Sequence, residues 1–109
     1  MKKFCLALDL IDDPELIAEY EKYHHNVWSE VKQSILDSGI INMEIYRVQN
    51  RLFMIVEADE NFSFEAKNEA DKNNPKVQEW EELMWKFQQQ LPNSKPGEKW
   101  QLMDKIFSL

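Results

Sequence analysis

The feature that most constrains the fold is a strict two-residue alternation over residues 3–10. One face of this segment carries only large apolar side chains, those of Phe4, Leu6, Leu8 and Leu10. Because side chains alternate across a strand, the pattern predicts a β-strand with one fully apolar side. With 43% apolar residues in 109, the chain is expected to fold around a core rather than remain disordered.

Helical signals follow directly. Asp12 or Asp13 is placed to cap a helix that has Pro14 at its first position. Apolar residues then recur at three- and four-residue spacing between Tyr20 and Ile35, which predicts one continuous amphipathic helix. Gly39 is expected to end this helix in a left-handed conformation.

Residues 41–48 and 51–58 resemble two paired strands. Gln49-Asn50 lies between them and predicts a two-residue turn, in which Asn50 tolerates positive φ. The second segment again alternates, with one face made by Leu52, Met54, Val56 and Ala58.

The rest of the chain is predicted to form two helices and a final strand. Asn61 or Ser63 starts a short helix that runs to about Asp71, and Asn74 with Pro75 starts another, which Pro92 closes. One face of the second helix is apolar, formed by Val77, Trp80, Met84 and Phe87. A last strand is expected over residues 100–107.

The expected order is therefore β-α-β-β-α-α-β within a single domain of residues 1–109. This order is typical of an α+β protein with the ferredoxin-like, split βαβ plan: a four-stranded antiparallel sheet with helices on one face. The other face holds apolar and aromatic residues and should not meet water. We expect two copies to stack their sheets as a homodimeric α/β barrel, with a pocket between sheet and helix.

Charge and composition exclude several functions. A net charge of −7 argues against nucleic acid and anionic membranes as partners. No apolar run is long enough to span a membrane, and Asp9 interrupts the N-terminal apolar stretch, so we expect a cytoplasmic protein. Only two glycines are present, which leaves little scope for binding a nucleotide cofactor.

The candidate site centres on the two adjacent histidines. Tyr20 and His24 are four residues apart and should share one helical face, whereas His25 points elsewhere. Adjacent positions of a helix cannot chelate one metal ion, and no third ligand stands at metal spacing, so no metal is expected. His24 is either a proton-transfer group, since its ordinary pKa lies near neutrality, or a hydrogen-bonded structural histidine.

Three further residues also bear on the site, namely Trp80, Glu57 and Glu81. Trp80 could stack on the apolar face of a sugar or simply pack in the core. Glu57 closes an apolar strand and could hold a substrate hydroxyl or a histidine, or reach solvent. Glu81 belongs to an acidic helical run that is typical of a solvated surface.

A set of residues spread along the chain carries a resemblance to a known family. These are Glu19-Tyr20-x-x-x-His24-x-x-Val27-Trp28, Glu30, Gly39, Asn42, Ile45-Tyr46, Leu52-Phe53, Val56-Glu57, Gln78-x-Trp80, Leu91-Pro92 and Lys105-Ile106-Phe107. In order and spacing they resemble the L-rhamnose mutarotase family over essentially the whole chain. The resemblance implies a small cytoplasmic homodimer with a ferredoxin-like fold. It also implies that the chain interconverts the α and β anomers of a deoxy-hexose without cofactor or metal.

The resemblance also assigns roles to single residues. His24 matches the family's acid/base histidine, Tyr20 its substrate-binding tyrosine, and Trp80 the first of its tryptophan pair. These positions imply a monosaccharide as the small-molecule partner.

Three departures from the family pattern bear on sugar recognition. Met43 stands where the family has a tyrosine, Glu81 replaces the second tryptophan, and His25-Asn26 replaces Asn-Pro. The reaction type is therefore expected to transfer better than the substrate. L-Fucose and L-rhamnose, both 6-deoxy sugars, are the candidates.

Two alternative functions share the same fold. Other dimeric α/β-barrel proteins are small monooxygenases or haem-degrading enzymes, where a histidine and a tryptophan could also serve. A non-catalytic dimeric sugar-binding or regulatory module is the other alternative. Sugar binding without anomer exchange would identify that module.

Overall fold

The structure is a computed structural model that describes residues 1–109. One antiparallel sheet contains the strands β1 (Lys2–Leu10), β2 (Ile40–Val48), β3 (Arg51–Ala58), β4 (Gln88–Gln89) and β5 (Gln101–Leu102). The helices are α1 (Pro14–His24), α2 (Ser29–Asp37), α3 (Phe64–Lys72) and α4 (Pro75–Trp85). The strand order is β2-β3-β1-β4, and β5 pairs with β1 as well.

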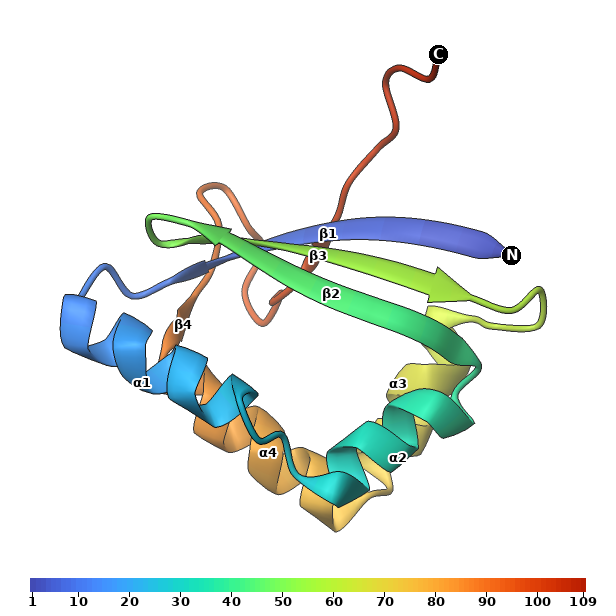
Figure 1. Ribbon diagram of the computed structural model, residues 1–109, viewed down its shortest axis with the longest axis horizontal. Helices are drawn as coiled ribbons and strands as arrows, with labels where there is room; N and C mark the ends of the chain where they lie inside the picture. Colours follow the sequence, from blue (N-terminus) through green and yellow to red (C-terminus); the bar gives the residue numbers. More distant parts are fainter.

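The molecule has two layers. All four helices lie beneath one face of the sheet, and the C-terminal tail leaves on the opposite side (Figure 1). This arrangement is the α+β, ferredoxin-like plan expected from the sequence. The sheet has five strands rather than four, because residues 86–109 contribute two short strands instead of one long one.

Alternation in the central strands decides which side chains form the core. β1 and β3 pair so that Leu6 lies opposite Met54 and Leu8 opposite Leu52, all on the helical face. Leu8 is fully buried and Leu52 is 2% exposed. Burying such a side chain contributes about 1.5–3 kcal/mol, so this face holds the two layers together.

Side-chain caps fix where the helices begin. The Asp13 carboxylate accepts hydrogen bonds from the Glu15 and Leu16 amides, with Pro14 at the first helical position. Ser63 caps α3 and Asn74 caps α4 in the same way. These helix starts were predicted from the sequence. Of the candidate capping residues, the structure shows Asp13 rather than Asp12 and Ser63 rather than Asn61.

The single long helix predicted from residue 14 to Gly39 is wrong, because the chain forms two helices. α1 ends at His24, and α2 begins at Ser29 after Trp28, whose backbone is not helical at φ −56° and ψ 137°. The intervening Asn26 and Val27 are both weak helix formers. Breaking the helix lets α1 and α2 lie at an angle beneath the sheet (Figure 1).

Gly39 follows α2 with φ +100°, as predicted. A Cβ at this position would lie 2.9 Å from the Asp59 carboxylate, so both space and backbone favour glycine. In the hairpin, however, Gln49 rather than Asn50 has positive φ, at 53°. The Asn50 amide instead donates to the Leu10 carbonyl, which ties the turn to β1.

The prediction that Pro92 closes the last helix is also wrong, since α4 ends at Trp85. Phe87 and Gln88 turn back to the sheet, where the Ile11 amide donates to the Phe87 carbonyl at 2.8 Å. Gln88 then pairs with Leu10 as β4. Hydrogen bonding to β1 therefore overrides the helical periodicity that continues to Phe87.

The final strand is shorter than the predicted 100–107. Only Gln101 and Leu102 pair with β1, and the Met103 amide adds one bond to the Cys5 carbonyl. Residues 104–109 form no strand, and Ile106 is 95% exposed. The apolar pattern of this tail is thus not satisfied within one chain.

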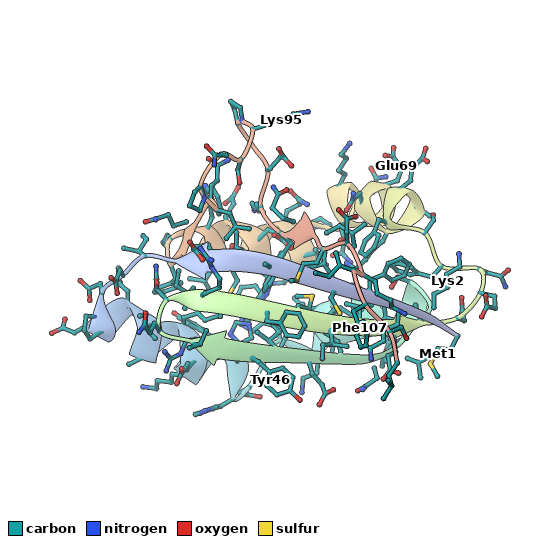
Figure 2. The ribbon with its side chains drawn as sticks, turned by 90° about the horizontal axis from the view of Figure 1, so that it is seen from above. Met1, Lys2, Tyr46, Glu69, Lys95 and Phe107 are labelled. Atoms are coloured by element: carbon teal, nitrogen blue, oxygen red, sulfur yellow. The ribbon has the colours of Figure 1, made fainter.

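The face of the sheet opposite the helices is open. Phe53 and Ile55 on β3 are half-buried, and Tyr46 on β2 is exposed. Figure 2 looks onto this face and labels Tyr46 together with Phe107 of the tail. The buried polar residue on this open face is Asp9, which accepts two hydrogen bonds from the Arg51 guanidinium.

Candidate functional site

A cavity of about 470 Å³ opens between the junction of α1 with α2 and the edge strand β2. Its wall is mostly apolar, with His24 and Lys32 among the few polar members. The apolar wall includes Val27, Ile35, Met43 and Ile45. A cavity of this size with few polar groups is typical of a small-molecule site.

His24 is held in one orientation by its own helix. Its Nδ1 lies 2.9 Å from the Tyr20 carbonyl oxygen. A carbonyl oxygen only accepts, so Nδ1 carries the proton and donates it. In the neutral ring the other nitrogen, Nε2, therefore keeps its lone pair and is free to take a proton.

Burial keeps this ring neutral. Desolvation lowers the pKa of His24 below its ordinary value of 6.5, and the hydrogen bond to the Tyr20 carbonyl opposes that shift only in part. The unprotonated imidazole is therefore the dominant form at neutral pH. This is the protonation state that a general base requires.

Aromatic rings from α1 and α4 pack against His24. The centroid of the Tyr20 ring lies 4.3 Å from that of the imidazole, and the centroid of the Trp80 ring lies 5.6 Å from it, with the two ring planes at 66°. Trp28 packs edge-on against Trp80 at 5.2 Å. These contacts explain why the break between α1 and α2 still leaves Trp28 beside the predicted site.

The Tyr20 hydroxyl is a neutral hydrogen-bonding group. Burial raises the pKa of Tyr20 to about 12; a hydrogen bond from Gln88 lowers it and the nearby Glu81 charge raises it further. The Gln88 amide nitrogen lies 3.5 Å from the phenol oxygen. Tyr20 thus keeps its proton throughout the neutral range and cannot act there as a base.

The structure brings four of the predicted site residues together. His24 and Met43 both line the cavity, and Tyr20 and Trp80 pack directly on His24. Trp80 is only 7% exposed, so it supports the site and the core at once. His25 is exposed and does not share this environment.

The two predicted glutamates lie elsewhere. Glu81 is half-buried on α4 and forms an ion pair with Lys99 at 3.2 Å, within electrostatic reach of the Tyr20 phenol. In the sheet register Glu57 lies opposite Lys3 of β1 and Asn42 of β2. Its carboxylate accepts a hydrogen bond from the side-chain amide of Asn42. Glu57 therefore lies on the open face of the sheet, whereas its neighbour Val56 is buried on the helical face. Glu57 does not line the cavity.

Gln88 is a buried polar residue near the site that the sequence analysis missed. It falls within Gln88-Gln89-Gln90, which resembles the polar end of a helix. No pattern distinguishes the first glutamine from the other two. Only the turn back to β1 buries Gln88 beside Tyr20.

A second, smaller cavity of about 310 Å³ lies between α2 and the α3–α4 pair. It contains none of the predicted site residues. Its charged side chains include Lys67 and Asp71, which already form an ion pair at 2.6 Å. The cavity at His24 is therefore the better candidate site. Each of the four helices is too short or too polar to span a lipid bilayer.

Comparisons with known proteins identify relatives of this chain. The chain is 45% identical over 111 residues to L-fucose mutarotase of Xanthomonas campestris pv. campestris, covering 100% of this chain and 89% of that protein. The crystal structure of an L-rhamnose mutarotase from Formosa agariphila superposes with a TM-score of 0.73 at 20% identity, covering 100% of this chain and 99% of that chain.

A dimeric ferredoxin-like protein from an uncultured marine organism is similar in fold, with a TM-score of 0.54 at 18% identity over 98% of this chain and 90% of that chain. The family model described as L-rhamnose mutarotase matches residues 3–109. The chain therefore belongs to the L-rhamnose mutarotase family of carbohydrate isomerases.

Proposed function

We propose that the chain interconverts the α and β anomers of L-fucose at the cavity beside His24, with L-rhamnose as a weaker substrate. The observation that carries the proposal is His24 itself, a neutral imidazole with a fixed Nδ1–H and a free Nε2 at the cavity wall. The preference for L-fucose rests on the relative that is 45% identical over the whole chain.

The chemistry needs only proton transfers, so a single positioned base can serve both steps. Nε2 of His24 takes the proton of the anomeric hydroxyl, and the bond from C1 to the ring oxygen breaks. The imidazolium returns that proton to the ring oxygen, which leaves the open-chain aldehyde. Rotation about the C1–C2 bond and the reverse transfers give the other anomer, without a cofactor.

The cavity wall supports a 6-deoxy sugar. The methyl group at C6 is apolar and suits a wall built from residues such as Val27 and Ile35. Met43, which stands where the family has a tyrosine, removes a hydroxyl from this wall and makes it more apolar. We propose that Met43 contacts the sugar and contributes to the choice between the two 6-deoxy hexoses.

The remaining predicted residues have different proposed roles. We propose that Tyr20 binds a sugar hydroxyl and that Trp80 fixes the orientation of the His24 imidazole by packing against it. Glu81 acts from the edge of the site by its charge on Tyr20. For Glu57, the hydrogen bond to Asn42 on the open face favours a structural role.

Saturation-transfer NMR on a sugar panel tests the proposal. The native protein should accelerate exchange between the anomeric protons of L-fucose most, those of L-rhamnose less, and those of D-glucose not at all. Exchange that is unchanged for all three sugars would reject the mutarotase and favour a binding module. Turnover of an oxidisable substrate, or a Soret band on adding haem, would favour the monooxygenase alternative.

We also propose that the chain works as a homodimer through the open face of its sheet. Phe53 and Ile55 are half-buried on this face, and the tail beyond β5 exposes Ile106 and Phe107 at 95% and 76%. Apolar groups at such exposure favour a second surface that covers them. A mass near twice 13.1 kDa by light scattering would support the dimer, and a monomer at micromolar concentration would contradict it.

Family membership supports two further parts of the proposal. We propose that residues 1–109 act as one mutarotase domain, because the family match extends from residue 3 to 109. We also propose a cytoplasmic location, where a free deoxy-hexose enters metabolism. Fractionation of the native host would test this location directly.

A further inference from the structure

Lys32 is a cation on the wall of the cavity beside His24 that no carboxylate of the chain neutralises. It lies on α2 and lines the cavity together with Ile35 and Leu36. None of the ion pairs of the chain involves its ammonium group. Lys32 is exposed, so the ammonium can stay in contact with water while the aliphatic stem lies along the apolar wall.

The sequence leaves Lys32 without a charged neighbour on its own helix. Side chains three and four positions apart are neighbours on a helix, and at these spacings Lys32 has only uncharged residues. By contrast, every lysine of α3 and α4 forms an ion pair with a carboxylate three or four positions away; these are Lys67, Lys72 and Lys76. A chain with 20 carboxylates and 13 cationic side chains thus leaves free a helical cation that lines the cavity.

Lys32 supplies the hydrogen-bond donors that the rest of the cavity wall lacks. The polar lining residues are His24, Lys32 and Asn42. The side-chain amide of Asn42 already donates to Glu57 on the open face. Nδ1 of His24 is engaged with the Tyr20 carbonyl, which leaves Nε2 as an acceptor. The free N–H donors among the lining side chains are therefore concentrated in the Lys32 ammonium.

A pyranose can use both of these groups at once. Each of its hydroxyl oxygens carries two acceptor lone pairs, and a lysine ammonium carries three donors. While Nε2 of His24 takes the proton of the anomeric hydroxyl, the ammonium can donate to the oxygen of another hydroxyl. The two groups come from different helices, α1 and α2, on the wall of one cavity, so together they would fix which end of the sugar meets the base.

We propose that Lys32 is a sugar-binding residue that donates a hydrogen bond to one ring hydroxyl of the deoxy-hexose, away from C1. This inference rests on the proposed mutarotase function and adds an orienting residue to it. A sugar that lacks the recognised hydroxyl gains nothing from Lys32. Lys32 thus contributes affinity and orientation, whereas His24 carries out the proton transfer.

The test compares Lys32→Met, which keeps an unbranched apolar stem, with Lys22→Met as the matched control. Lys22 is an exposed lysine of α1 that does not line the cavity, and its loss changes the net charge equally. Saturation-transfer NMR over a range of L-fucose concentrations gives kcat and KM. Lys32→Met should raise KM about 10-fold with kcat nearly unchanged, because a hydrogen bond from a charged donor is lost. Lys22→Met should match the native protein.

Monodeoxy sugars identify the recognised hydroxyl and separate recognition from a general effect of charge. For one of 2-deoxy-, 3-deoxy- and 4-deoxy-L-fucose, native protein and Lys32→Met should have equal KM, since the hydrogen bond is absent in both. A rise in KM that is the same for every sugar would overturn the proposal. A native KM for L-fucose in Lys32→Met, or an equal rise in Lys22→Met, would also overturn it.

Lysine acylation tests the contact on the native protein. An amine-selective acylating reagent is applied with and without saturating L-fucose, and mass spectrometry measures the modification of each lysine. The sugar should slow acylation of Lys32 several-fold and leave that of Lys22 unchanged. Equal acylation of Lys32 with and without sugar would overturn the inference. The proposed function fails separately, because native protein would then accelerate exchange of no sugar.

Discussion

The two faces of the sheet bury their apolar residues by different means. On the helical face, which the chain's own helices cover, Leu52 and Val56 are 2% and 1% exposed. On the open face, their neighbours Phe53 and Ile55 remain half-buried, and no helix lies on that side. One face is thus completed within the chain and forms a wall of the site, while the other requires a partner surface.

The largest expected effect comes from the completed face. Leu52→Ala should lower the free energy of unfolding by about 2–5 kcal/mol, because it leaves a cavity in a closely packed core. Denaturant unfolding should show this loss equally at low and high protein concentration. Phe53→Ala is the matched control one residue away. Its loss should depend on concentration, and a concentration-independent loss would contradict a second copy on the open face.

A charge on the open face should separate association from folding. Ile55→Glu should cost the dimer several kcal/mol, since an unpaired carboxylate would be buried between the two sheets. Sedimentation should then report a monomer that keeps the native circular dichroism spectrum. An Ile55→Glu protein that remains dimeric would place the interface elsewhere.

A smaller effect should follow from loosening the helix that carries His24. Asp13→Ala removes the acceptor of the Glu15 and Leu16 amides, which should cost about 1 kcal/mol of stability. Because the cap is exposed and far from the open face, sedimentation should show unchanged association. A shift in association with Asp13→Ala would mean that the two faces are coupled.

The smallest expected effect is a loss of native stability at acidic pH. The pKa of folded His24 lies below the ordinary value of 6.5, so the unfolded chain binds its proton first as pH falls. Native stability should therefore fall as pH drops below about 6.5, more steeply than in His24→Gln. Thermal unfolding of both proteins between pH 7.5 and 5 measures the difference. Parallel curves would show that His24 is not buried as a neutral ring.

Local signals in the sequence predicted the elements that depend on few residues. Asp13 with Pro14, Asn74 with Pro75, and Gly39 each act on the backbone next to them, and each appears as predicted. The alternation of β1 and β3 also predicted which side chains face the helices, because a strand has only two faces.

The failures share a different cause, since each depends on contacts distant in sequence. The break before Ser29 lets Trp28 pack on Trp80, which lies 52 positions further along the chain. The early end of α4 depends on pairing of Gln88 with Leu10. Helical periodicity continues through both places, so periodicity alone could not have located them.

The site divides in the same way. Tyr20 and His24 were predicted to lie together because one turn of helix separates them, and their ring centroids lie 4.3 Å apart. Gln88 could not be predicted, because its burial beside Tyr20 arises only when β4 joins the sheet. Met43 and Glu81 were identified only through resemblance to the family.

The adjacent histidines offer the most direct test of the account, because they differ in environment but not in chemistry. Anomer exchange of L-fucose should be measured by saturation-transfer NMR with native protein, His24→Ala and His25→Ala, each checked for native circular dichroism. The account predicts that exchange falls to the uncatalysed rate in His24→Ala and is unchanged in His25→Ala. Full activity in a folded His24→Ala protein would contradict it.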